Sequence, residues 1–195
     1  YAHRLRKQHD AVLVGIGTVL EDDPELTTRL VRGKNPVRVV LDSSLRISLM
    51  ATVLNPVAET IIFAGEDADV VKGEALAALP NVEVVRLPLE GGRLPIAQVV
   101  QKLAERGLTS LLVEGGSAVH GAFFDAGLAD RVCAFIAPKL IGGAQALPPV
   151  GGVGADLVET GWQLESVEFT QLGSDLLVTG LVPGYAKLPL TKEAD

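Results

Sequence analysis

Apolar residues occur along the chain in short runs that alternate with polar or glycine-containing segments. Most runs are rich in Val, Ile and Leu, and are either continuous or alternate every second residue, which is the pattern of buried strands. None approaches the roughly 20 apolar residues that a membrane-spanning helix needs. The pattern predicts strands at 11–16, 37–41, 60–64, 82–87, 110–113, 131–137, 163–169 and 175–181.

Helical spacing appears between several of these runs. Residues 95–106 place apolar side chains on one stripe, with a proline at the start and Gly107 just past the end. Proline fits the first turn of a helix and glycine fits the position after the last turn. The same reasoning predicts helices at 117–126, at 74–79 and at 1–8.

Strands that alternate with helices indicate an α/β protein with three layers and a mostly parallel sheet covered on both faces. The last two runs are separated only by 171–174, which predicts an antiparallel hairpin and makes the sheet mixed. We expect one domain over 1–182 and a loosely ordered tail over 183–195. The Gly- and Pro-rich stretch 142–154 is a long loop, hence functional or mobile.

The charge balance narrows the classes of partner. The 195 residues carry a net charge of −7, and only 4% are aromatic, which argues against nucleic acid. Residues 1–40 nevertheless contain seven Lys or Arg and five Asp or Glu, so a basic region suited to small anions lies near the start. Scattered solvated charges are the alternative. The single Cys133 lies in an apolar run and is expected to be a core residue in a reducing, cytoplasmic compartment.

The segment 111–117 passes from an apolar strand through two glycines into a predicted helix. Such a turn presents free backbone N–H groups and the positive end of the helix, which suits the pyrophosphate of a cofactor. A plain turn with Ser117 as the helix N-cap is the alternative. Glu114 ends the strand, where a carboxylate is unfavourable unless it binds something.

Two further segments end predicted strands with polar residues. Residues 15–27 contain a Gly-x-Gly without the third glycine of a dinucleotide fingerprint, then three acids before Pro24. The acids fit the C-terminus of a helix or a solvated turn, and a metal site is disfavoured because no further ligands follow at suitable spacing. The segment 39–46 carries Asp42, Ser43 and Arg46 at and after the end of a strand. These side chains suit the ribose hydroxyls or the 2′-phosphate of a nucleotide. The alternative is a simple turn capped by the Asp or Ser side chain.

The histidines His3, His9 and His120 form no catalytic constellation in the sequence. No nucleophile elbow, Walker loop or Cys/His zinc spacing occurs. Hydrolase and NTPase functions are therefore disfavoured.

Five ordered motifs resemble the reductase domain of the bacterial bifunctional deaminase-reductase of riboflavin biosynthesis. The match extends to about Leu181 and excludes chance. The motifs are HRLR at 3–6, DAVLVGIGTVLEDDPELT at 10–27, PVRVVLD at 36–42, VEGG at 113–116 and IAPKLIGG at 136–143.

The resemblance implies a dihydrofolate-reductase-like fold, with a mixed, mostly parallel central sheet and an antiparallel C-terminal hairpin. It implies NADPH as hydride donor and 5-amino-6-(5-phosphoribosylamino)uracil as substrate. The ribosylamine opens to an imine, and hydride adds at C1′ to give the ribitylamine. Because no residue is an obvious general acid, catalysis is expected to rest mostly on positioning.

The resemblance also assigns site residues to this chain. Arg6, Leu26, Arg29 and Glu114 match substrate-contacting positions, and the two arginines suit a phosphate monoester. Lys139 lies near the site in the family pattern without an assigned role. The positions that match cofactor contacts are Thr18, Asp22, Ser43, Gly116, Ser117, Ala118, Val119, His120, Gly121 and Ala122.

The chain lacks the His-x-Glu and Pro-Cys-x-x-Cys zinc signature of the deaminase half, so it is not expected to deaminate on its own. The resemblance places a zinc deaminase domain, and the first strand of the reductase fold, upstream of Tyr1. It also implies a homodimer. A monofunctional reductase of the not-yet-deaminated diaminopyrimidine, a paralogue with another substrate, and a non-catalytic nucleotide-binding remnant remain alternatives.

Overall fold

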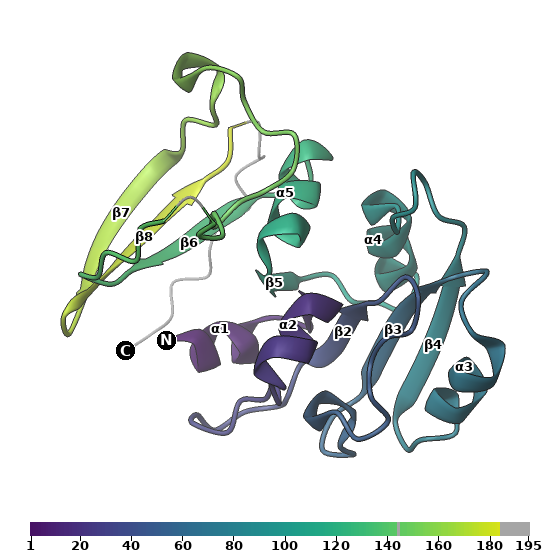
Figure 1. The fold of residues 1–195 in the computed structure, drawn as a ribbon. Coiled ribbons are helices and arrows are strands. Elements are labelled where there is room, and N and C mark those ends of the chain that lie inside the picture. Colours follow the sequence, from purple (N-terminus) through teal and green to yellow (C-terminus); the bar gives the residue numbers. More distant parts are fainter. Residues whose placement is uncertain (144, 184–195) are drawn as a thin grey trace.

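A computed structural model describes residues 1–143 and 145–183, and its main body is a parallel sheet flanked by helices (Figure 1). The sheet has five strands in the order β4-β3-β2-β1-β5, with parallel pairing throughout. The predicted largely parallel α/β architecture is confirmed. The strands are β1 (Ala11–Gly15), β2 (Val37–Leu41), β3 (Thr60–Gly65), β4 (Val82–Leu87) and β5 (Leu111–Gly115).

The core divides into two apolar clusters, one on each face of this sheet. β1, β2 and β3 are buried along their whole length, because side chains that alternate in direction meet a helical layer on either side. One cluster contains Val12 and Val14, and helices α2 (Ile16–Asp22) and α3 (Val70–Ala77) supply residues to it. The other contains Leu13, and helices α4 (Ile96–Ala104) and α5 (Ser117–Asp125) contribute to it. The three predicted layers are present.

Two helices differ from the sequence prediction. The sequence offered a helix C-terminus at residues 21–23 but did not predict the start of α2, because Gly17 and the β-branched residues around it have weak helix propensity. Burial of Ile16 and Val19 against the sheet stabilises this helix instead. α3 begins at Val70 rather than at 74, since the Asp69 carboxylate accepts a hydrogen bond from the Lys72 backbone N–H at 2.9 Å and caps the helix. The predicted first helix is present as α1 (Ala2–Gln8).

The C-terminal strands form a separate sheet. β6 (Arg131–Ile136), β7 (Glu165–Leu172) and β8 (Asp175–Leu181) pair antiparallel in the order β6-β8-β7, and β7 and β8 make the predicted hairpin. The expectation of one mixed sheet is not met. In the part of the chain that the structure describes, β5 pairs only with β1 and β6 only with β8, so the sheet is interrupted between β5 and β6.

The connection from β6 to the hairpin begins with residues 137–143 and 145–157, which contain no helix or strand. Short 3-10 turns occur at Thr52–Leu54 and Val158–Thr160. The predicted tail lies outside the described residues, except for Pro183. No helix within the described ranges is long and apolar enough to cross a membrane.

Candidate functional site

The carboxyl ends of β2, β1 and β5 lie at one edge of the parallel sheet, because these strands are neighbours that run in the same direction. The edge therefore gathers Ser43 after β2, Thr18 in α2 after β1, and the glycine turn Gly115–Gly116 after β5. Ligands of open α/β sheets bind at such an edge. Three segments predicted separately thus lie at one edge of the sheet.

The glycine turn places backbone without side chains beside a helix end. Gly116 is the N-cap of α5, without a side-chain cap, so the alternative of Ser117 as N-cap is wrong. A Cβ on Gly115 or Gly116 would lie 3.5 or 3.6 Å from the Thr18 hydroxyl oxygen, so Thr18 stands directly beside the turn. A Cβ on Gly15 would come within 2.8 Å of Val119. The uncapped N–H groups and the neighbouring hydroxyl suit the phosphates of a dinucleotide.

Glu114 is directed by a β-bulge. The β1–β5 register pairs Leu13 with Val113 and then Val14 with Gly115, which leaves Glu114 as the extra residue. Bulges re-aim side chains and occur beside active sites. The Glu114 carboxylate accepts two hydrogen bonds from Arg6, at 2.6 Å from Nε and 2.6 Å from Nη2. The Arg6 side chain is only 12% exposed and the Glu114 side chain only 20%. The pairing is therefore bidentate and largely shielded.

Two further polar groups surround this ion pair. Arg6 Nη1 donates to the Thr27 carbonyl oxygen at 3.1 Å, which links the pair to the loop after α2. The Thr27 hydroxyl and His3 Nδ1 are buried atoms without a hydrogen-bond partner in the described structure. Burial lowers the pKa of His3, and the positive charges of Arg6 and Arg29 add to this effect. His3 is consequently neutral at neutral pH and presents an unused polar atom beside Glu114 and Arg6.

His3 and Thr27 were not predicted as site residues. The available signal for His3 is its spacing, since it lies three residues before Arg6 on α1 and so on the same face of that helix. For Thr27 the sequence carries no such signal, because its place depends on how the loop folds back onto Arg6.

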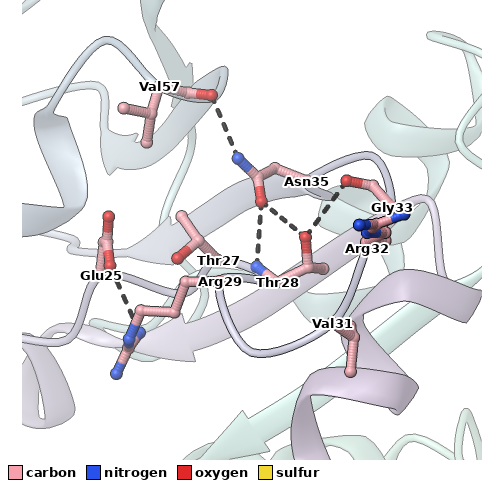
Figure 2. A pocket seen from close by; sticks show the side chains of 9 residues that line it. All are labelled: Glu25, Thr27, Thr28, Arg29, Val31, Arg32, Gly33, Asn35 and Val57. Carbon is pink, nitrogen blue, oxygen red and sulfur yellow. Dashed lines mark hydrogen bonds and ion pairs between the residues drawn. The ribbon is translucent and has the colours of Figure 1, made fainter.

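The loop after α2 encloses an open hollow of about 460 Å³ (Figure 2). Its lining includes Thr27, Arg29 and Arg32, and Asn35 holds the loop by accepting from the Thr28 N–H and hydroxyl, each at 2.9 Å. Arg29 is exposed and lies 3.3 Å from the Glu25 carboxylate. A guanidinium and a buried hydroxyl at one hollow suit an oxyanion such as a phosphate monoester.

Leu26, immediately before Thr27, is almost fully buried and has a φ of 55°. A left-handed backbone is unfavourable for a bulky residue and occurs mainly where the surrounding structure imposes it. Leu26 thus fixes the direction in which the loop leaves α2. The predicted substrate positions Arg6, Leu26, Arg29 and Glu114 are brought together by α1, this loop and β5.

The turn after β2 is built on a buried carboxylate. Asp42 is fully buried and accepts from the Ile47 N–H at 2.8 Å, while Arg46 Nε lies 4.0 Å from its other, otherwise unpartnered oxygen. The Ser43 carbonyl accepts from the Gly65 N–H at 2.9 Å, which holds the turn against β3. Ser43 and the exposed Arg46 are therefore presented at the sheet edge by a fixed turn.

The other predicted residues, Asp22 and Lys139, lie on the surface outside the Arg6–Glu114 pair and the glycine turn. Asp22 is exposed at the end of α2, one helical turn beyond Thr18. Its neighbour Asp23 accepts from the Thr52 hydroxyl and N–H, which lower the pKa of the Asp23 carboxyl. Lys139 is exposed in the loop after β6. Across residues 1–143 and 145–183, no cluster of three or more His, Cys, Asp or Glu side chains is placed to hold a metal ion.

The chain is similar to several known proteins. Residues 1–178 match the family model of the RibD C-terminal domain. The riboflavin biosynthesis protein RibD of Bacillus amyloliquefaciens is 41% identical over 182 residues, which cover 92% of this chain and 48% of that protein. The 2,5-diamino-6-ribosylamino-4(3H)-pyrimidinone 5′-phosphate reductase of Methanothermobacter thermautotrophicus is 39% identical over 186 residues, covering 93% of this chain and 84% of the relative.

A solved structure has the same fold. The diaminohydroxyphosphoribosylaminopyrimidine deaminase/5-amino-6-(5-phosphoribosylamino)uracil reductase of Thermotoga maritima superposes with a TM-score of 0.72 at 34% identity. The superposition covers 92% of this chain and 47% of that one. The chain thus spans about half the length of the RibD relatives that it matches.

Proposed function

Because the chain belongs to the RibD C-terminal domain family, we propose that it is the reductase unit of riboflavin biosynthesis. In this proposal it uses NADPH to reduce 5-amino-6-(5-phosphoribosylamino)uracil to the ribitylamino product. One observation carries the proposal. The shielded Arg6–Glu114 pair lies at the same sheet edge as an uncapped glycine turn, so a polar substrate and a dinucleotide have adjacent places.

The residues at the edge fit a nicotinamide dinucleotide. The backbone N–H groups at the start of α5 and the Thr18 hydroxyl would hold its phosphates. Ser43 and Arg46 would lie at the adenosine ribose and a 2′-phosphate, at the end of β2. When bound, the cofactor supplies the hydride that reduces C1′ of the opened ribosylamine. The Glu114 carboxylate, which would contact the substrate, lies at the bulge directly before the glycine turn.

The chain's own groups act on the substrate by binding and orientation. The Glu114 oxygens keep lone pairs that can accept from N–H groups of a pyrimidine, while Arg6 holds the carboxylate in a fixed orientation. Arg29 and the Thr27 hydroxyl, at the hollow, would receive the phosphate. With both ends of the substrate held, positioning of C1′ supplies most of the rate enhancement.

Replacing the Glu114 carboxylate tests the proposal most directly. Glu114→Gln keeps the shape but removes the charge that Arg6 pairs with, so the KM for the phosphoribosylaminouracil should rise about 10- to 100-fold, the effect of losing a charge-assisted hydrogen bond. The dissociation constant for NADPH should stay within about twofold. NADPH oxidation and NADPH fluorescence titration measure the two quantities. Unchanged substrate kinetics would contradict the role of Glu114, and absence of turnover by the unsubstituted chain would contradict the proposed function.

Cofactor selectivity is tested at Arg46. Arg46→Ala should raise the KM for NADPH about tenfold and leave that for NADH unchanged, because only NADPH carries the 2′-phosphate that a guanidinium would bind. Arg93→Ala, on the isolated bridge beyond β4, is the matched control and should alter neither value. Equal use of the two cofactors by the unsubstituted chain would refute an NADPH preference.

A second substrate deserves a direct comparison, because the archaeal relative with 84% of its length covered is named as a diaminopyrimidinone phosphate reductase. That substrate keeps an amino group where the uracil has an oxygen. The ratio of kcat/KM for the two compounds, measured on this chain, decides which one it reduces. We further propose that the working enzyme is a cytoplasmic homodimer whose longer polypeptide carries a zinc deaminase domain, and sedimentation of that longer form tests the dimer.

A further inference from the structure

The imidazole of His120 connects two backbone segments that are distant in sequence. His120 lies in the first half of α5, and its Nε2 is 3.3 Å from the Val113 carbonyl oxygen in β5. Its Nδ1 is 2.9 Å from the Pro149 carbonyl oxygen in the loop after β6. A carbonyl oxygen can only accept, and a neutral imidazole carries one N–H, so the neutral ring donates to only one of these carbonyls at a time; the Nε2–H tautomer is the one that donates to Val113.

The Val113 contact lies at the β-bulge. Val113 is the last residue in register with β1 before the extra residue Glu114, so its carbonyl belongs to the segment whose course sets the direction of the Glu114 side chain. Within the described residues β5 is an edge strand, and backbone groups on its outer side need partners other than a neighbouring strand. His120 supplies such a partner from one side, and Arg6 holds the carboxylate itself from the other.

The Pro149 contact belongs to a separate attachment. Residues 149–154, called the strap below, lie along α5 and are held by three further backbone donors. The Gly151 N–H donates to the Ser117 carbonyl at 2.9 Å, and the Asp125 carboxylate accepts from the N–H groups of Val153 and Gly154, at 2.8 and 3.2 Å. Loss of the Pro149 contact alone would leave these attachments in place.

We propose that His120 is a positioning residue for the Glu114 carboxylate: its Nε2–H holds the Val113 carbonyl and so fixes the bulge that directs Glu114 towards Arg6. This role concerns the Glu114 side of the site, whereas the family resemblance places His120 among the cofactor contacts. The substrate part of the proposal rests on the proposed reductase function. A side chain engaged with Val113 and Pro149 acts on substrate binding, whereas a cofactor contact would act on NADPH binding.

Two substitutions separate the ring nitrogens. In Gln the amide nitrogen is as many bonds from Cβ as Nε2, so His120→Gln keeps a donor for Val113. In Asn the amide nitrogen corresponds to Nδ1, so His120→Asn keeps a donor for Pro149 and loses the Val113 contact. The proposal expects the KM for the phosphoribosylaminouracil to rise about tenfold in His120→Asn, the effect of one lost hydrogen bond, and about twofold or less in His120→Gln. The dissociation constant for NADPH should remain unchanged in both.

Asp125→Ala is the matched control, because it loosens the strap on the same helix without touching Val113. It should lower the melting temperature and leave the substrate KM unchanged. An equal rise of KM in Asp125→Ala and His120→Asn would overturn the proposal, since the effect would then come from the strap. Retention of substrate binding by His120→Asn but not by His120→Gln, or a change confined to NADPH binding, would also overturn it.

A measurement without turnover keeps this test independent of the proposed function. The Arg6 Nε–H is held by Glu114 at 2.6 Å and should give a slowly exchanging proton signal in NMR spectra of the full chain. The signal should persist in His120→Gln and exchange faster in His120→Asn. If the unsubstituted chain shows this signal but oxidises no NADPH, the proposed function fails and the positioning role stands. The same exchange rate in both variants would refute the positioning role.

Discussion

At the scale of single residues, two shielded arginines of this chain have opposite kinds of partner. Arg6 forms an ion pair with a carboxylate, whereas Arg38, near the start of β2, donates its hydrogen bonds to neutral oxygens. Its guanidinium donates to the Asn55 side chain at 2.7 Å and to the carbonyls of Asn55 and Ala58 at 2.5 and 2.6 Å. Burial lowers the pKa of Arg38 to about 10, so it remains charged at neutral pH. Arg38 therefore holds the 55–58 loop against the sheet.

Removing that guanidinium should destabilise the fold without altering the site. Arg38→Met retains most of the side-chain volume but leaves the partly buried carbonyls of Asn55 and Ala58 without their donor, so the free energy of unfolding should fall by about 2 kcal/mol. Urea unfolding followed by circular dichroism measures the loss. Arg106→Met, which removes an exposed pair with Glu83, is the control and should cost less than about 1 kcal/mol. Similar small losses in both variants would contradict a structural role for Arg38.

At the scale of elements, β5 is the strand on which the site depends, and β1 is its only strand partner in the described structure. Asp10, just before β1, strengthens that pairing from outside the ladder. Its carboxylate accepts from the N–H groups of Thr109 and Ser110 at 2.9 and 3.0 Å, and from both of their hydroxyls at 3.0 Å. The hydrogen bond from the Thr109 backbone is the main reason why the pKa of Asp10 is lowered. The start of β5 is thereby fixed to the start of β1.

This contact predicts a pH-dependent stability difference. A carboxyl whose pKa is lower in the folded state stabilises the fold above its ordinary value of 3.8, and this contribution is lost as the pH falls through the folded pKa. Asp10→Asn should therefore lower the free energy of unfolding by about 1 kcal/mol at neutral pH, since Asp10 is exposed. Urea titrations of both proteins from neutral pH to below 3.8 should converge. A difference independent of pH would exclude the charge as its source.

The elements were predictable to the extent that burial follows a simple period. β1, β2 and β3 are buried on both faces and appear in the sequence as continuous apolar runs. The start of α2 escaped prediction because the stability of this helix comes from packing of Ile16 and Val19 rather than from helix propensity. The gap between β5 and β6 was equally hidden, since an apolar run does not specify which strand lies beside it.

The site was predictable where its chemistry is local. The glycine turn and Glu114 adjoin each other in the sequence, and their use follows from the order strand, turn, helix. The partnership of Arg6 with Glu114 spans 108 positions and was not predicted, since the family resemblance assigned each of them separately to the substrate. The bulge that directs Glu114 depends on registration with β1, and local periodicity carries no information about it.

At the scale of the whole molecule, the two sheets end in strand edges that have no partner within the described residues. The edge strands are β4 and β5 in the large sheet and β6 and β7 in the small one, and β6 is the edge of the small sheet that lies towards the main body (Figure 1). Tyr1, beside α1, contacts Phe135 of β6 edge to face, with ring centroids 6.0 Å apart. Phe135 and Ile136 are still 48% and 52% exposed. Open edges and exposed apolar side chains mark a place where a further strand can pair.

Amide hydrogen exchange tests whether these edges are open in solution. Amides of β2 have neighbours on both sides and should exchange only on global unfolding, whereas amides of β5 and β6 that do not donate to β1 or β8 should exchange at least about 100-fold faster. In a longer form of the polypeptide, a strand that pairs with both edges would slow these same amides and join the two sheets. Uniformly slow exchange along β5 and β6 in the 195-residue chain would show that its edges are already covered, and concentration dependence of that protection would identify a second copy as the cover.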